Sequence, residues 1–362
     1  MSEGKILWKQ LAALTALYAS VIIGWIAYYN YQPKLLEKYE FNDLTLFLFV
    51  AQGIILVITP MIAGRLGDKY RHKAGKRLPI ISAGISTAAM IFMSVAFTLI
   101  MNPGPIFKWI LPVLIVFWLF SMALFTSPAI STIELFVPAK RLPRAMAMLT
   151  VVYGLLYAIE PIVVFIIVTI GAPLTFVVGG VAVFFSGLAL KRTSGEIVDV
   201  PKKVAEFGKS DYSYALVLGI VFGIVTTILF NMVPVWLDSK GVVIFDLEGS
   251  AEVSMVLAAV AVFSVPISRY VESKSVHFSV LVSVIALFAV ITGIFYINNP
   301  GVVIFMLILF ALFYSMMSVS FLPLALSIVR DNNKVFGVGV FFAGFELPNG
   351  ILEAFLVATE SF

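Results

Sequence analysis

Residues 44–77 read LTLFLFVAQGIILVITPMIAGRLGDKYRHKAGKR, and this stretch contains the pattern that decides the fold. Its first part, residues 44–63, carries no charged side chain, whereas residues 64–77 carry six Lys or Arg. A bilayer core about 30 Å thick needs roughly 20 apolar residues of helix to cross it. The stretch therefore predicts a helix that crosses a membrane and ends in a basic connection on one side.

The composition of the whole chain supports a membrane protein. Of the 362 residues, 61% are hydrophobic and 12% are charged, whereas a soluble domain has about 25% charged residues. The mean hydropathy is +1.06. A soluble fold would leave much of this apolar surface exposed to water. The first apolar run is also longer than the core of a signal peptide, so we interpret it as the first span.

Eleven apolar stretches are predicted to span the membrane. They are residues 11–31, 44–63, 79–101, 109–136, 145–170, 173–190, 215–237, 251–267, 278–297, 302–329 and 336–359. We expect an N-terminal six-helix bundle over 1–190, a cytoplasmic linker over 191–211 and a C-terminal five-helix bundle over 212–362. A twelfth span is missing from this pattern, and either the natural protein lacks it or the sequence is incomplete.

The positions of the basic residues predict the orientation. All 24 Lys and Arg fall between the predicted spans, 20 in connections on the side of the N-terminus and four on the other side. The four are Lys34, Lys38, Lys108 and Lys240. Because short cytoplasmic loops are enriched in Lys and Arg, we expect the N-terminus in the cytoplasm of a multi-pass plasma-membrane protein.

The two bundles contain traces of an internal repeat. The connection GRLGD at 64–68 is matched by SRYVE at 268–272, and both follow the second helix of a bundle. Glu160-Pro161 and Glu346-Leu347-Pro348 lie in equivalent helices of the two halves. Repeated bundles related by an axis along the membrane normal are typical of transporters, with the substrate site between them.

Residues 64–80, GRLGDKYRHKAGKRLPI, resemble the signature loop of the major facilitator superfamily. Their spacing resembles that of its glycoside–cation symporter and sucrose-transporter branch. Gly24-Trp25, Pro60 and residues 134–147 (ELFVPAKRLPRAMA) add to the resemblance. It implies an all-α polytopic fold of two pseudo-repeated bundles that transports a solute by alternating access.

The fourth predicted helix departs from the sucrose-transporter branch. The branch carries an intramembrane acid in this helix and an arginine just after a proline, and the resemblance implies that both bind sugar and proton. Here Pro128 is present, no acid precedes it, and Ile130 stands at the position of the arginine.

Charged residues of the signature loop and its equivalents are predicted to form an inner gate. The first-half candidates are Asp68, Arg71, Lys76, Arg77, Glu134 and Arg144, and the second-half candidates are Arg269 and Glu272. Ion pairs among them would hold the halves together at the cytoplasmic face and break when the cavity opens inward. The alternative is that the basic members only set the topology.

Two glutamates are candidates for proton binding. Glu160 and Glu346 lie within predicted spans, where ionisable side chains are costly and are functional candidates. Burial favours the neutral form of a carboxyl group, so such a group can bind and release a proton as access alternates. The alternative is a protonated glutamate bonded to a carbonyl that Pro161 or Pro348 frees from the helix.

A substrate cavity is expected mainly between helices one, four, seven and ten, and helix two adds Gln52. The further candidates for binding substrate are Trp25, Tyr28, Gln52, Tyr157, Asn231 and Tyr314. Amides are few in this set, which favours a solute less polar than a disaccharide. The alternative for each aromatic residue is packing or an interfacial belt.

The remaining residues give no sign of an enzyme. The chain has no cysteine, its only histidines are His72 and His277 in polar connections, and no phosphate-binding loop is present. We expect no cofactor, no metal and no nucleic-acid partner. The sequence therefore predicts a proton-coupled secondary transporter of a small organic solute, sugar-like or less polar, whose partners are lipid, substrate and protons. The alternative is a non-transporting facilitator-like subunit or assembly factor of a membrane complex, and an ion channel is a weaker third possibility.

Overall fold

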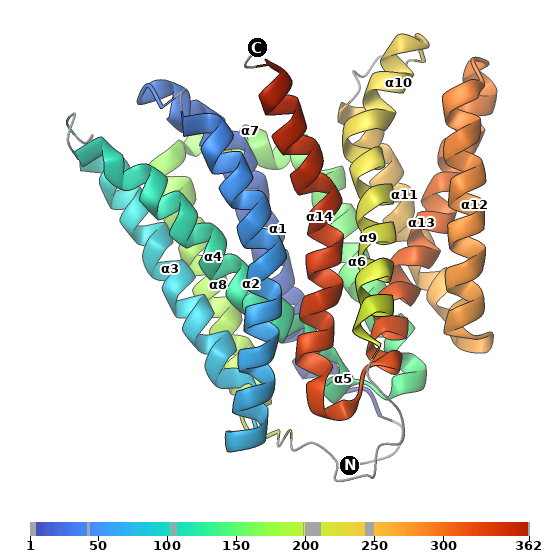
Figure 1. Ribbon diagram of the computed structural model, residues 1–362, viewed down its shortest axis with the longest axis horizontal. Helices are drawn as coiled ribbons and strands as arrows, with labels where there is room; N and C mark the ends of the chain where they lie inside the picture. The colour runs from blue at the N-terminus through green and yellow to red at the C-terminus, as the bar shows by residue number, and fades with distance from the viewer. Residues whose placement is uncertain are drawn as a thin grey trace.

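The computed structural model describes residues 5–41, 44–101, 104, 107–197, 199, 211–242 and 250–360, which form helices and connections without a strand (Figure 1). Ten of these helices are long and apolar enough to cross a membrane, and a bent pair of helices makes an eleventh span. The prediction of about eleven spans in an all-α membrane fold is confirmed. Most of the predicted linker, residues 198 and 200–210, lies outside the described part of the chain.

The first half of the chain forms helices α1 to α8. Their bounds are α1 Trp8–Lys38, α2 Thr45–Ala74, α3 Leu78–Met101, α4 Ile110–Ser131, α5 Ile133–Phe136, α6 Leu142–Ala158, α7 Glu160–Ile170 and α8 Ala172–Ser194. Short 3₁₀ turns at Phe107–Trp109 and Ala139–Arg141 precede α4 and α6.

The second half forms helices α9 to α14. Their bounds are α9 Tyr212–Thr227, α10 Val233–Ser239, α11 Ser250–Ser273, α12 Val276–Tyr296, α13 Pro300–Ile328 and α14 Lys334–Glu360. A π-helical turn at Ile228–Met232 joins α9 to α10, and a 3₁₀ turn at Asp331–Asn333 precedes α14.

Several helices are longer than their predicted spans. Helix α2 continues to Ala74, eleven residues past the apolar segment 44–63, and α1 continues to Lys38. Lys and Arg are good helix formers, so a helix can extend beyond the hydrocarbon into the water-exposed layer. The basic residues from Arg65 to Lys73 therefore lie on a helical extension rather than in a loop.

The predicted span 145–170 is not one straight helix. Helices α6 and α7 meet at Ile159 with a bend of 61°. Pro161 has no backbone N–H and cannot continue the hydrogen-bond ladder, but it is tolerated in the first turn of a new helix. Pro348 has a different effect, because α14 runs through it as one helix.

The two halves meet along two helix pairs, α2 with α14 and α6 with α11. Glycines bring these backbones close together. A Cβ added to Gly64 of α2 would lie 2.6 Å from Phe336 Cα, and one added to Gly154 of α6 would lie 2.5 Å from the Leu257 oxygen. Small residues allow such close approach between membrane helices, and any larger side chain would push the halves apart.

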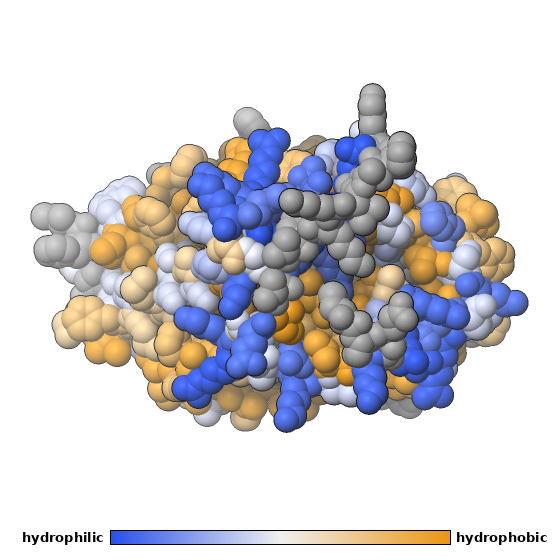
Figure 2. Space-filling model, turned by 90° about the horizontal axis from the view of Figure 1, so that it is seen from below, coloured by the Kyte–Doolittle hydropathy of each residue, from blue (hydrophilic) through white to orange (hydrophobic). Residues whose placement is uncertain are grey.

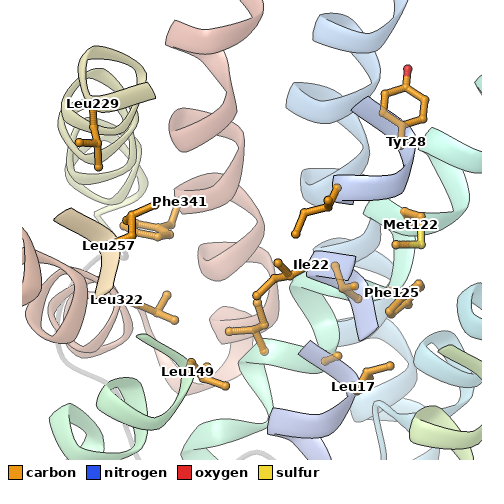
Figure 3. Close-up of a cluster of buried hydrophobic side chains, with 14 of the residues drawn as sticks. Leu17, Ile22, Tyr28, Met122, Phe125, Leu149, Leu229, Leu257, Leu322 and Phe341 are labelled. Atoms are coloured by element: carbon orange, nitrogen blue, oxygen red, sulfur yellow. The ribbon is translucent and has the colours of Figure 1, made fainter. Parts of the chain in front are cut away.

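The surface agrees with a membrane protein. Large apolar side chains point outward on several helices, among them Phe288 (75% exposed), Phe165 (70%) and Val262 (68%). The end of the molecule that carries the N-terminus has many hydrophilic residues (Figure 2). The apolar core continues across the boundary between the halves, because Ile22 of α1, Leu322 of α13 and Phe341 of α14 belong to one cluster of buried side chains (Figure 3).

Candidate functional site

Six charged side chains form a closed ring at the end of the bundle that carries the N-terminus. We call this set the charge ring. Going around it, the residues are Arg71, Asp199, Arg77, Glu134, Lys334 and Asp331, and each basic residue lies between two acids. Four of them come from the first half and the segment after α8, and Asp331 and Lys334 come from the second half.

Arg77 is the most deeply buried member of the charge ring, with 1% of its surface exposed. Its Nη2 donates to Glu134 Oε1 at 2.9 Å, its Nε donates to Asp199, and its Nη1 donates to the carbonyl and the hydroxyl of Ser131 at 2.9 Å each. Burial alone lowers the pKa of this guanidinium, but Glu134 and Asp199 outweigh burial and raise the pKa above its usual value. Arg77 therefore stays charged.

Two ion pairs of the charge ring connect the halves directly. Lys334 Nζ lies 3.0 Å from Glu134 Oε2, and Arg71 Nη2 lies 3.3 Å from Asp331 Oδ2. Arg71 Nη1 also donates to the backbone oxygen of Asp331, and Arg71 Nε donates to Asp199 Oδ1 at 2.7 Å. Removing one partner of a buried, hydrogen-bonded ion pair strongly destabilises the folded protein, because the other charge stays buried without compensation.

Asp68 of α2 caps the beginning of α14. Its carboxylate accepts hydrogen bonds from the backbone N–H of Phe336 at 2.9 Å and of Val335 at 3.2 Å. The first N–H groups of a helix have no partner within the helix and carry partial positive charge, so an acidic side chain there is stabilising. A residue of the first half thus completes a helix of the second.

A second contact at the same end joins the other helix pair. Arg144 Nη2 at the start of α6 lies 2.7 Å from Glu272 Oε2 at the end of α11. Asp68 and Glu272 occupy equivalent places in the two halves, and each contacts the start of a helix in the opposite half. The charge ring, the Asp68 cap and the Arg144–Glu272 pair together close this end of the interface.

Deeper in the membrane, polar side chains form a chain across the halves. Tyr28 Oη donates to Gln52 Oε1 at 2.7 Å, and Gln52 Nε2 donates to Glu353 Oε2 at 2.9 Å. Asn349 Nδ2 donates to Glu353 Oε1 at 2.8 Å, and Asn231 Nδ2 lies 3.5 Å from Asn349 Oδ1. This polar chain links α1 and α2 to α14 and the π-helical turn.

The π-helical turn has a local cause. Pro234 lies in the first turn of α10, and its ring would clash with the carbonyl four residues earlier in a regular helix. The helix widens by one residue, as π-bulges do, often at functional sites. Asn231 lies within this turn and also donates to the Thr227 oxygen at 3.1 Å.

A cavity of about 100 Å³ lies between the halves. Its aromatic lining comprises Tyr18, Tyr153, Phe222, Tyr314, Phe341, Phe342 and Phe345, from α1, α6, α9, α13 and α14. Leu149 of α6 and Leu322 of α13 also line the cavity and are drawn with Phe341 of α14 in Figure 3. Glu346 follows Phe345 on α14.

Most of the residues predicted for an inner gate contact charged or backbone groups at this end of the bundle. Asp68, Arg71, Arg77, Glu134, Arg144 and Glu272 all take part in the contacts above. Lys76 instead donates to the backbone oxygen of Gly195. Arg269 is exposed and joins none of the ion pairs found among the described residues.

The predicted substrate residues divide between the polar chain and the cavity. Tyr28, Gln52 and Asn231 belong to the polar chain, and Tyr314 lines the cavity. Tyr157 lies beside the cavity, with its ring 4.8 Å from that of Tyr153.

Two further candidates lie outside both groups. Glu160 is half-buried at the start of α7. Trp25 packs edge-on against Trp118, with ring centroids 5.1 Å apart.

Four contributors were missed by the sequence predictions. They are Asp199, Asp331 and Lys334 of the charge ring, and Asn349 of the polar chain. Glu353 follows Glu346 by seven residues, and this spacing predicts from the sequence that both lie on one side of a helix. For Asp199 and Asp331 the sequence has no comparable signal, because each lies in a connection whose path only the fold defines.

Comparisons with known proteins agree with this architecture. No curated protein matches the sequence. Two solved structures of a bacterial homologue of the iron transporter ferroportin in the outward-facing state share the fold at 13% identity. One, soaked with iron, has a TM-score of 0.68 over 97% of this chain and 91% of that chain, and the other has a TM-score of 0.69 over 98% and 92%.

A family model described as Major Facilitator Superfamily matches residues 97–351. This match covers more than half of the chain and includes α4 to α13 and most of α14. With eleven spans in two bundles that meet along α2–α14 and α6–α11, the chain belongs to the major facilitator superfamily.

Proposed function

We propose that this protein is a proton-coupled secondary transporter that moves a small organic solute by alternating access between its two helix bundles. The observation that carries the proposal is the placement of Glu346 and Glu353 on α14. Both lie in a spanning helix that packs against the first half, and no Lys or Arg of the described residues lies in the middle third of a span.

Carboxyl groups in this position suit proton coupling. An ionised carboxylate without a cation nearby is expensive inside a membrane, so it is neutralised by a proton or by a bound cation. Glu353 is held by Gln52 of the first half and Asn349 of the second, so movement of the halves changes its hydrogen bonds. Glu346 follows the cavity-lining Phe345 on α14 and is our candidate for the proton carrier.

The charge ring supplies a gate for alternating access. Its ion pairs and the Asp68 cap join the halves at one end, and these contacts must break before the cavity opens there. This end holds most of the Lys and Arg, so we propose that it faces the cytoplasm of the plasma membrane, in line with the positive-inside bias. The N-terminus would then be cytoplasmic.

The substrate is proposed to be less polar than a disaccharide. The loop at 64–80 supports a relation to the glycoside–cation symporter branch, but α4 has no ionisable side chain at the places where that branch has an acid and an arginine. The polar side chains near the cavity are mainly tyrosines rather than amides and charges. A solute with few hydroxyl groups fits this lining better than a sugar with many.

Transport can be tested in proteoliposomes that contain a pH-sensitive dye. Addition of substrate should change the internal pH only when the protein is present, and a pH gradient should drive solute uptake. Sugars, organic acids and organic ammonium ions form the panel. Glu346→Gln should abolish the coupled proton movement, whereas Glu37→Gln should not, because Glu37 is exposed at the end of α1.

The opposite outcome would favour a non-transporting role. If no member of the panel moves and Glu346→Gln changes only thermal stability, the chain acts as a subunit or assembly factor rather than as a transporter. Purification from native membranes would then recover a partner protein in a fixed ratio.

The orientation can be tested separately, because the chain has no cysteine. Cells carrying Lys73→Cys or Lys34→Cys are treated with a membrane-impermeant thiol reagent. We expect the cysteine at position 34 to react in intact cells and that at position 73 to react only after lysis. Labelling in the reverse order would place the charge ring outside the cell.

A further inference from the structure

A second hollow lies at the end of the molecule that carries the N-terminus. This cleft measures about 360 Å³, and its lining comes from both halves. The lining residues are Arg65, Asp68, Lys69 and His72 of α2, Tyr212 of α9, Asn333 of the turn before α14, and Phe336 of α14. Helix α14 packs against both α2 and α9 and lies between them in Figure 1. The cleft therefore crosses the boundary between the halves, and it shares no lining residue with the aromatic cavity.

Two basic side chains of the cleft have no counter-charge within the described part of the chain. Arg65 and Lys69 are exposed, and neither forms an ion pair or a side-chain hydrogen bond with a described residue. The guanidinium of Arg65 lies over the ring of Phe336, 4.8 Å from the ring centroid. Stacking of this kind occupies the flat face of a guanidinium and leaves the N–H groups at its edge free to donate. The cleft thus presents two unpaired positive charges.

The acids near the cleft are engaged elsewhere. Asp68 is buried, and both of its carboxylate oxygens accept backbone N–H groups at the start of α14. Asp211, which precedes Tyr212, accepts the backbone N–H of Tyr214 at 2.9 Å at the start of α9. An acid is stabilised at the start of a helix, so neither carboxylate is drawn from its place by the basic side chains. Arg65 and Lys69 remain available to an anion that enters from outside.

The two basic side chains continue an apolar stripe along α2. Ile54, Ile58 and Ile62 are exposed, and Arg65 and Lys69 follow them at intervals of three and four residues. This spacing places all five on one side of the helix. In a bilayer the isoleucines face lipid chains, and the basic residues lie in the adjoining headgroup layer, where anionic lipids attract Lys and Arg. A lipid matches both parts of the stripe, whereas a soluble anion matches only its basic end.

The volume of the cleft suits a headgroup. One water molecule takes up about 30 Å³ in the liquid, so about 360 Å³ has room for a group of about ten non-hydrogen atoms. A phosphoglycerol headgroup is of this size, and a single inorganic ion would leave most of the cleft empty.

We propose that this cleft binds the phosphate headgroup of an anionic phospholipid, which Arg65 and Lys69 hold while an acyl chain lies along the isoleucine stripe of α2. Arginine can donate two parallel hydrogen bonds to a phosphate, and lysine adds a compact positive charge. The lipid belongs to the leaflet that surrounds the end of the molecule with the charge ring. Because a ligand that binds only the folded state stabilises it, occupation of the cleft raises the unfolding temperature.

Two phospholipids with the same acyl chains provide a matched test of binding. The full-length protein is purified in a nonionic detergent, and its thermal unfolding is followed while dioleoyl phosphatidylglycerol or the zwitterionic dioleoyl phosphatidylcholine is added to the micelles. Phosphatidylglycerol should raise the unfolding temperature in a saturable way, with an apparent affinity at least about tenfold higher than that of phosphatidylcholine. Equal effects of both lipids, or no effect of phosphatidylglycerol, would overturn the inference.

A soluble phosphate ester tests whether the lipid chain matters. Glycerol 1-phosphate carries the same charged group without an acyl chain, and at the same concentration it should leave the unfolding temperature unchanged. A shift as large as that caused by phosphatidylglycerol would show that the cleft binds soluble phosphates, and the lipid assignment would be wrong.

Variants locate the binding in the cleft. A basic residue near an anionic lipid surface contributes about fivefold in affinity, so the double variant Arg65→Gln with Lys69→Gln should bind phosphatidylglycerol about thirtyfold more weakly. The control is Lys191→Gln with Arg192→Gln, because these residues are exposed at the end of α8, carry the same two charges and do not line the cleft. An equal loss in both double variants would show attraction to the basic surface in general and contradict the site. If the first double variant does not fold, Lys69→Gln alone should still lower the affinity about fivefold.

The lipid test and the transport test fail independently. Binding of phosphatidylglycerol is measured without a gradient or a transported solute, so it can be found although no proton-coupled flux exists. Proton-coupled uptake in a protein that does not distinguish the two lipids would refute the lipid site and leave the transport proposal intact.

Discussion

The cap that Asp68 places on α14 offers a direct test of the inner gate. The carboxylate accepts two backbone N–H groups from the opposite half and is only 6% exposed. Asp68→Asn keeps the shape and one acceptor oxygen but removes the charge and one of the two bonds. Hydrogen bonds to a charged group contribute about 1.5–3 kcal/mol each, so we expect the closed state to lose about 2 kcal/mol relative to the open state.

A loss of this size changes the ratio of open to closed molecules about thirtyfold. Spin labels at Lys73→Cys and Lys274→Cys, both exposed at this end, report the separation of the halves by pulsed electron resonance. The longer distance should become more populated in Asp68→Asn. Glu196→Gln is the control, because Glu196 is exposed at the same end.

The reasoning would be refuted by an unchanged distance distribution in a variant that folds normally. In that case the ion pairs of the charge ring would hold the gate without the cap, and the hydrogen bonds of Asp68 would only stabilise the start of α14. Thermal unfolding of the same samples separates a change in gate position from general loss of structure.

Two further predictions concern packing and charge. Gly64→Leu should separate α2 from α14 and increase the same spin-label distance, because an added Cβ would lie 2.6 Å from Phe336 Cα; Gly104→Leu, where an added Cβ meets nothing within 4 Å, should have no effect. Arg77→Ala should lower the stability by about 3–5 kcal/mol, because two buried carboxylates each lose one of their two basic partners. Thermal unfolding checks this, with the exposed Arg192→Ala as control, and an equal melting temperature for both variants would contradict it.

The spans could be predicted because lipid imposes a simple requirement. A helix must bury about 20 apolar residues to cross the bilayer, and segments such as 44–63 meet it without help from the rest of the fold. The bend at Ile159 was partly foreseeable from Pro161, but Pro348 shows why a proline alone is insufficient. The same residue type bends one span and is accommodated within α14, depending on the helices packed around it.

The gate was predicted only in part, for a reason of geometry. Members in or near the signature loop, such as Arg77 and Glu134, could be recognised in the sequence. The positive-inside bias explains the basic residues of this region but not the acidic ones, so the acids indicate ion pairs. Asp199 and Asp331 lie in connections with ordinary polar composition, and Lys334 is the first residue of α14. Their pairing depends on where the segment after α8 and the turn before α14 pass in space. Local sequence patterns do not predict how close these two segments come to each other.

The sequence by itself determined the approximate number of spans and the end at which basic residues gather, because these follow from the length and polarity of individual segments. Only the tertiary structure decided that Asp68 caps α14, that Glu353 meets Gln52, and that aromatic rings from five helices surround one cavity. Such contacts join residues far apart in the chain. They depend on the close approach of α2 to α14 and of α6 to α11, which the packing of the two bundles determines.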